Sequence, residues 1–119
     1  MLVEKLKAAN KTTELFAIGT NSIATATMMK AGANHGATGE NPVVVNSRDA
    51  DVIVGPLGIL AADALMGEIT PAMAVAVGQS SAMKVLLPVN KCNHFVVGVE
   101  EKPFQEMIEM AVEHIQKLL

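Results

Sequence analysis

The chain has little of several residue types on which common protein functions depend. Its 119 residues include no Trp, no Tyr, three Phe and one Cys. A single Cys excludes an intramolecular disulfide framework. Arg48 is the only arginine, and the eight lysines are scattered singly along the chain. Nucleic-acid-binding proteins need a clustered basic face, and single-strand binders add aromatic stacking platforms, so we expect no nucleic-acid partner.

Long hydrophobic runs are also missing. The most apolar stretch, residues 52–66, is too short to span a bilayer and contains two glycines, a proline and an aspartate. No basic segment followed by an apolar one marks the N-terminus as a signal peptide. We therefore expect a soluble, cytoplasmic protein without a membrane partner.

What the chain does have is a large content of small and medium apolar residues. Hydrophobic residues make up 50% of the sequence, eight of them Met, and the net charge is −3. Such a composition favours a folded core over disorder. The length suits one domain, which we expect to cover residues 1–119.

Short apolar runs rich in β-branched residues predict four buried strands, at residues 14–18, 51–55, 84–89 and 95–99. Helical periodicity predicts helices over residues 2–9, 23–31, 58–66 and 71–77, the last of them capped by Thr70 with Pro71 at its first position. A further helix is predicted from Pro103 to the end of the chain, where apolar residues at steps of three and four form an amphipathic stripe.

Two neighbouring segments are less regular. Residues 32–42 are rich in glycine and asparagine and predict a loop, while residues 43–46 suit either a helical turn after Pro42 or a short strand of three valines. Strands without polar alternation, separated by helices, indicate an α/β sandwich around a mostly parallel sheet.

Polar residues follow three of the predicted strands. In open α/β sheets, ligands bind at the carboxyl ends of the strands, where helix N-termini also attract anions. Asn21 or Ser22 suits the N-cap of the second helix. The same turns are also what any strand-to-helix connection needs, and none matches a dinucleotide or Walker motif. The candidate ligand-binding residues are Gly19, Thr20, Asn21, Ser22, Gly55, Gly58, Asn90, Cys92 and Asn93.

Cys92 has two interpretations. Beside Lys91 and His94 its thiol would have a raised thiolate fraction, as in a nucleophile or redox centre, but a lone Cys also serves as a small buried residue. The three histidines, at positions 35, 94 and 114, have no metal-ligand spacing, so we expect no metal site.

Several motifs taken in order resemble those of a known family. They lie at residues 18–25, 30–34, 36–41, 67–71 and 90–93, and the resemblance extends over all 119 residues. The family consists of small, uncharacterised bacterial proteins, and the resemblance implies a Rossmann-like three-layer sandwich without an established reaction. Relatives begin with a strand and a glycine-rich turn ahead of the first helix. Because this chain starts at that helix, without an N-cap, we expect its domain to lack the first strand.

Two functions of different class are compatible with these observations. The first is binding of a small molecule, namely a nucleotide, dinucleotide or phosphorylated metabolite, at the carboxyl ends of the strands, with enzymatic activity left open. The second is a non-catalytic regulatory or scaffold protein that forms a homodimer, because a missing first strand would expose a strand edge to another chain.

Overall fold

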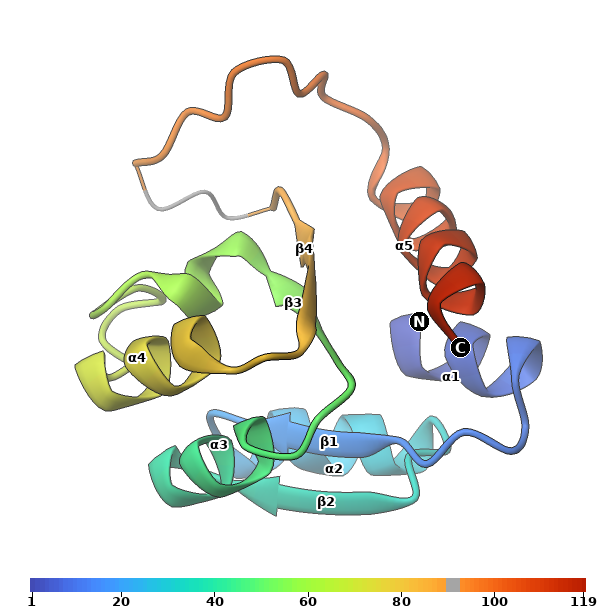
Figure 1. Ribbon diagram of the computed structural model, residues 1–119, viewed down its shortest axis with the longest axis horizontal. Coiled ribbons are helices and arrows are strands. Elements are labelled where there is room, and N and C mark those ends of the chain that lie inside the picture. The colour runs from blue at the N-terminus through green and yellow to red at the C-terminus, as the bar shows by residue number, and fades with distance from the viewer. Residues whose placement is uncertain (90–92) are drawn as a thin grey trace.

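The computed structural model describes residues 1–89 and 93–119. It is a mixed α/β protein in which helices and short strands alternate along the chain (Figure 1). In order, the elements are α1 (Leu2–Ala9), β1 (Phe16–Gly19), α2 (Ser22–Lys30), β2 (His35–Thr38), α3 (Glu40–Ser47), β3 (Val52–Pro56), the 3₁₀ helix η1 (Leu57–Leu60), α4 (Pro71–Gln79), β4 (Met83–Leu87) and α5 (Phe104–Leu118).

The strands form two separate parallel pairs. β1 pairs with β2, from Phe16 opposite His35 to Gly19 opposite Thr38. β3 pairs with β4, and Pro56 at the end of β3 lies opposite Leu87. Each pair is connected through a helix, α2 in the first and α4 in the second, as parallel pairing requires. The parallel α/β arrangement predicted from the sequence is thus confirmed, in two small sheets rather than one.

Helix α2 lies close against the first pair because two glycines leave room for it. A Cβ on Gly19 would stand 2.2 Å from Thr25 Oγ1 and 2.8 Å from Thr25 N, and one on Gly36 would meet the Met29 side chain at 2.6 Å. Thr25 is buried, and its hydroxyl lies 2.8 Å from that of Thr38 at the end of β2. Small residues in β1 and β2 therefore set the distance between helix and sheet.

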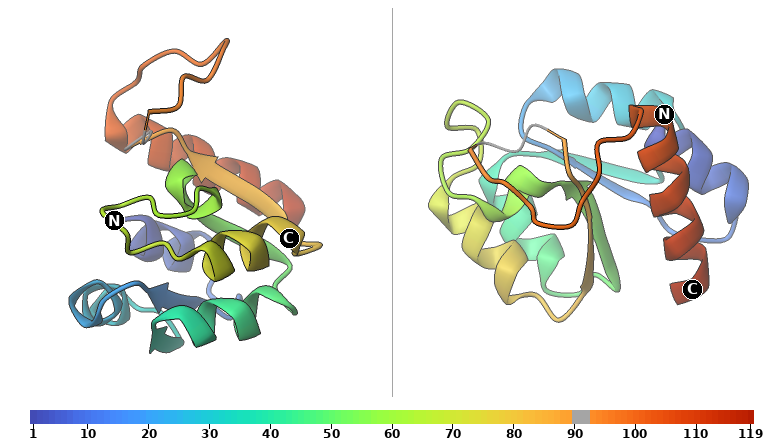
Figure 2. Two further views of the ribbon diagram at one scale, coloured as in Figure 1. Left: turned by 90° about the vertical axis from the view of Figure 1, so that its left-hand side faces the viewer. Right: turned by 90° about the horizontal axis from the view of Figure 1, so that it is seen from above.

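The main core lies between the second pair and the helices α1 and α5. The amphipathic stripe predicted for the last helix is confirmed: Ile108, 1% exposed, is the most deeply buried large side chain in the described residues. Viewed from above, α1 and α5 lie side by side, with α4 on the other side of β3 and β4 (Figure 2). The buried members of this cluster are Leu6, Leu87, Ile108, Ala111, Val112 and Ile115.

A second, smaller core forms around α4. Ile69, Met73 and Ala74 are buried in it, and Val43 of α3 and Ile59 of η1 pack against them. Thr70 is the N-cap of α4, because its Oγ1 accepts the Met73 N–H at 3.2 Å, and Pro71 is the first helical residue. This start is the one that the sequence predicts.

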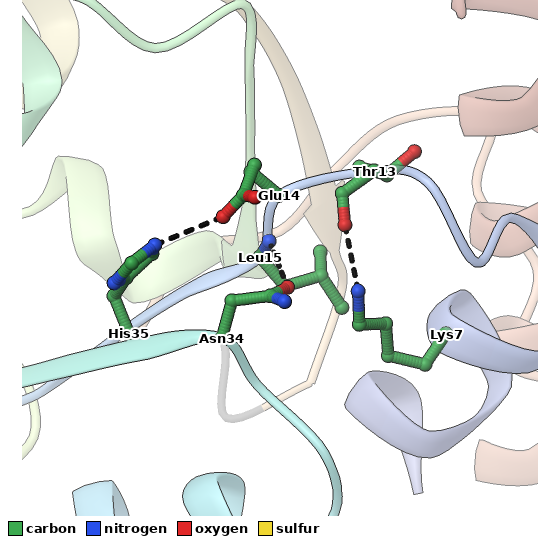
Figure 3. A network of polar contacts seen from close by, with 6 residues as sticks. All are labelled: Lys7, Thr13, Glu14, Leu15, Asn34 and His35. Carbon is green, nitrogen blue, oxygen red and sulfur yellow. Dashed lines mark hydrogen bonds and ion pairs between the residues drawn. The ribbon is translucent and has the colours of Figure 1, made fainter.

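A network of polar contacts holds the amino ends of β1 and β2 together (Figure 3). The Leu15 N–H donates to Asn34 Oδ1 at 2.8 Å, and Glu14 Oε2 lies 2.9 Å from His35 Nε2. The His35 ring also stacks on Phe16, with 4.7 Å between centroids. Lys7 of α1 donates to the Thr13 carbonyl at 2.8 Å and so links the first helix to the segment that leads into β1.

Residues 32–42 differ in part from the prediction of a loop, and the structure decides between the two alternatives for residues 43–46. Residues 35–38 form β2, whose backbone pairs with β1 although its sequence has no apolar run. Of the two alternatives for residues 43–46, the structure shows the helical one, because these valines belong to α3. The Asn46 amide donates to the Pro42 carbonyl at 2.8 Å within that helix.

Two other predictions were wrong. The helix expected at residues 58–66 is a single 3₁₀ turn followed by a loop, in which Asp63, Leu65 and Met66 have positive φ values of 65°, 56° and 57°. The strand expected at residues 95–99 does not form either. Gly98 has a φ of 83°, which breaks an extended conformation, and Phe95 is 84% exposed.

The close approach of α2 predicts the outcome of one substitution. Gly19→Ala should lower the free energy of unfolding by about 2 kcal/mol, because its Cβ meets backbone as well as side-chain atoms of Thr25. Gly78→Ala is the matched control, since this exposed helical glycine has nothing within 4 Å of the added Cβ. It should raise stability by about 0.5–1 kcal/mol. Urea unfolding measures both, and equal effects would contradict the packing described.

Candidate functional site

The candidate site lies where β1 and β2 end. Gly19 and Thr38 are the last residues of the two strands and lie opposite each other. The Gly39 N–H donates to the Gly19 carbonyl at 2.9 Å and continues the pairing by one step. Asn21 is the N-cap of α2, because its Oδ1 accepts the Ala24 N–H at 2.8 Å. Of the two caps predicted from the sequence, the structure selects Asn21.

Thr20 and Asn21 direct two hydrogen-bond donors at one acceptor. The Thr20 hydroxyl donates to Glu68 Oε1, and Asn21 Nδ2 donates to the same oxygen at 3.1 Å. These donors, Thr20 first, lower the pKa of Glu68 below its ordinary value, against a smaller opposing effect of desolvation. The two polar residues after β1 therefore hold an anionic oxygen at the start of α2.

A second carboxylate, that of Glu40, follows the end of β2. Glu40, the first residue of α3, accepts a hydrogen bond from Thr70 Oγ1 at 2.5 Å. Since Thr70 is two residues after Glu68, the segment that carries Glu68 is attached at both of these residues. The ends of β1 and β2 are thus tied to the start of α4 through hydroxyl–carboxylate contacts. Apart from Asn21, the residues in these contacts are Thr20, Glu40, Glu68 and Thr70.

The loop before Glu68 is held in an unfavourable backbone conformation. Its three non-glycine residues with positive φ are followed by Gly67, whose φ is 89°. Asp63 N–H donates to the Ile69 carbonyl at 2.7 Å, and Ile69 N–H to the Ala64 carbonyl at 3.1 Å. Ile69 is buried while Met66 at the tip is fully exposed. Left-handed conformations of this kind persist where surrounding contacts impose them, and they concentrate at functional sites.

The other predicted site residues are distributed differently. Ser22 is the first residue of α2 and is exposed. Gly55 and Gly58 lie at the end of β3 and in η1, and a Cβ on Gly55 would stand 3.2 Å from the Ile59 side chain, so this glycine serves packing. Asn93 is exposed with a φ of 65°. Asn90 and Cys92 lie outside the described residues.

Sequence reasoning missed Glu68 and Thr25 as parts of this site. The local sequence of Glu68 fits a residue that precedes a capped helix, and nothing in it indicates a contact with Thr20, 48 residues earlier. For the described residues, no group of three or more His, Cys, Asp and Glu side chains is placed to bind a metal ion. No helix in residues 1–89 or 93–119 is long and apolar enough to cross a bilayer.

Fold and site together define an α/β protein with parallel strands and a polar cluster at the strand ends. The chain belongs to a family described as a domain of unknown function (DUF3842), whose model matches residues 1–119. The expected family resemblance is confirmed to that extent. No curated protein and no solved structure matches the chain.

The Glu68 contacts predict a pKa change that can be measured. Thr20→Val removes the stronger donor and should raise the pKa of Glu68 toward its ordinary value, as followed by ¹³C NMR titration of the side chain. Because the folded-state pKa is lowered, the contact stabilises the fold above the unfolded-state pKa and is lost as pH falls through the folded-state pKa. The stability difference between wild type and Thr20→Val should therefore shrink on acidification.

Thr27→Val is the matched control for this measurement. Thr27 lies on α2, the helix that follows Thr20, and its hydroxyl donates to the Ile23 carbonyl at 2.9 Å and not to Glu68. Its substitution should leave the Glu68 titration unchanged. An unaltered pKa in Thr20→Val would show that the Thr20–Glu68 contact does not form in solution.

Proposed function

We propose that the protein binds a nucleotide, dinucleotide or phosphorylated metabolite at the carboxyl ends of its strands, with a phosphate group at the start of α2. The observation that carries this proposal is the position of Glu68, whose carboxylate receives two hydrogen bonds at that helix start. The positive end of the helix dipole favours an anion at the same place. A phosphate oxygen accepts hydrogen bonds from hydroxyl and amide donors in the same way as a carboxylate oxygen.

In this proposal the ligand replaces Glu68 as the acceptor. Two negative groups cannot share the donors of Thr20 and Asn21 without repulsion, so the phosphate and the carboxylate compete. The contact broken in the exchange is an exposed one, and charge interactions at exposed positions are weak. Glu68 is exposed, so its side chain is free to turn toward solvent once the contact is released.

The proposal also assigns the chain to the Rossmann-like folds. The two parallel strand pairs, each connected through a helix, support a Rossmann-like sandwich, because that fold is built from such units. In such folds the ligand lies outside the carboxyl ends of the strands, which is where Thr20 and Asn21 are. No reaction is assigned, because two threonines, an asparagine and two carboxylates provide binding groups without an activated nucleophile.

Thermal-shift measurements against a panel of nucleotides, dinucleotides and sugar phosphates test this function. At least one ligand should raise the melting temperature of the wild type by a few degrees, as ligand binding at saturating concentration does. Glu68→Gln keeps the shape of the side chain but removes its charge, so it should bind the same ligand several-fold more tightly. Thr20→Val should lose most of the shift.

Thr27→Val again serves as the control and should respond like the wild type. If no phosphate-containing ligand shifts either the wild type or Glu68→Gln, the proposal is wrong. A ligand that binds equally well to Thr20→Val would place the site elsewhere.

A further inference from the structure

Two of the most exposed apolar side chains belong to the segments that form the polar cluster of the candidate site. That cluster consists of Thr20, Asn21 and Glu68. Met66 is 103% exposed and Ile23 is 78% exposed. Among the large apolar side chains of residues 1–89 and 93–119, only Val97 and Phe95, in the segment before α5, have comparable values. Exposed apolar surface of this extent is therefore confined to two places, and one of them is next to the polar cluster.

The chain itself keeps both side chains near the polar cluster. Ile23 is two residues after Asn21, in the first turn of α2, and Met66 is two residues before Glu68. Two residues span at most about 7 Å, so the Cα atom of each apolar residue lies within that distance of a cluster member. Asn21 Nδ2 and Glu68 Oε1 are 3.1 Å apart, which brings the two segments together. Each segment that contributes a polar group to the cluster thus also carries an exposed apolar residue.

A tight turn fixes the position of Met66. The Glu68 N–H donates to the Leu65 carbonyl at 3.1 Å, which makes Met66 and Gly67 the central residues of a four-residue turn. Their φ values, 57° and 89°, are both positive, as in a type I′ turn. Glycine, asparagine and aspartate dominate these positions, so a methionine here is strained. Its backbone conformation and its exposed side chain are both unfavourable in the free protein, a combination that indicates a functional role for Met66.

The proposed ligands differ in whether they would cover such side chains. A sugar phosphate carries hydroxyl groups next to its phosphate, and hydroxyl groups lose hydrogen bonds to water when they are placed against apolar side chains. A nucleobase has a planar face that packs between apolar or aromatic side chains. Small-molecule sites commonly combine a few placed polar groups with apolar contacts of this kind. Exposed apolar residues beside a phosphate-binding cluster therefore favour a ligand that carries a base.

We propose that the ligand is a nucleotide, with its phosphate at Thr20 and Asn21 and its base against Ile23 and Met66. This inference rests on the proposed function and narrows its ligands to phosphates that carry a base. Thr20 and Asn21 hold the phosphate, which all the candidate ligands share. The two apolar residues select the base, because its binding removes their side chains from water.

Calorimetric titration with matched ligands tests this assignment. The ribonucleoside 5′-monophosphates are compared with ribose 5-phosphate, which has the same sugar and phosphate without the base. At least one nucleotide should bind the wild type about fivefold more tightly than ribose 5-phosphate, because burial of one or two methylene-sized apolar groups has an effect of that order. Equal affinities for the nucleotides and for ribose 5-phosphate would overturn the assignment and leave the phosphate site in place.

Two variants remove the apolar contacts and keep the polar cluster. Met66→Asn introduces a residue that suits a left-handed backbone, so it should raise the melting temperature while it weakens nucleotide binding. Ile23→Ser should weaken nucleotide binding as well, and the double variant should bind nucleotides no more tightly than ribose 5-phosphate. Binding of ribose 5-phosphate itself should be unchanged. Met110→Ser is the matched control, because Met110 is a 53% exposed methionine of α5, outside both segments, and it should bind like the wild type.

Three other results would overturn the proposal. If Met66→Asn keeps the full preference for the nucleotide, the base lies elsewhere. If the wild type sediments as a dimer that Met66→Asn and Ile23→Ser dissociate, the two side chains belong to a contact between copies of the chain. If neither ribose 5-phosphate nor any nucleotide binds, the phosphate site is absent and the proposed function fails together with this inference.

Discussion

Parallel pairing of short strands is the constraint on which this structure depends. A parallel pair cannot be closed by a tight turn, so each pair needs a helix to carry the chain back, and that helix must cover the sheet it crosses. In the first pair this requirement explains the glycines at positions 19 and 36, which let α2 approach the strands. In the second pair the connecting helix is α4, and the apolar stripe of α5 and the buried face of α1 pack against β3 and β4 from the other side. The strands determine where the helices lie, and the helices in turn supply most of the buried apolar surface.

The same constraint explains how much of the fold could be predicted from the sequence. Features that depend on a few adjacent residues were predicted correctly: the Asn21 cap, the start of α4 at Thr70 and Pro71, and the stripe of α5. β2 could not be recognised, because His35 to Thr38 contains no run of large apolar residues, and Gly36 within it leaves room for Met29 of α2. It is a strand because it pairs with β1, which is too far away in the sequence for a reading of neighbouring residues to detect.

Residues 58–66 show the opposite error. Alanine and leucine in this segment favour a helix, yet the chain leaves the helical conformation after one 3₁₀ turn. The buried position of Ile69 and its backbone hydrogen bonds with Asp63 and Ala64 draw the loop back on itself, which three residues accommodate with positive φ. Here tertiary contacts override local propensity. For the candidate site, the sequence indicated Thr20 and Asn21 through their place after a strand, while Glu68 is a partner that only the three-dimensional arrangement reveals.

The two strand pairs are joined at this site, so the contacts that stabilise the fold are those that the proposed ligand would replace. The hydroxyl–carboxylate contacts of Thr20 with Glu68 and of Thr70 with Glu40 connect the first strand pair to the loop and helix of the second. Their donors are neutral and their acceptors carry the charge, so the cluster has an excess of negative charge and no cation of its own among these four side chains. Such a cluster holds the two pairs together through directed hydrogen bonds and not through ion pairing. An anion that took the place of Glu68 would gain the same donors, while the loop would stay anchored by the buried Ile69 and its backbone hydrogen bonds. Only the exposed Glu68 side chain would have to turn away from the cluster.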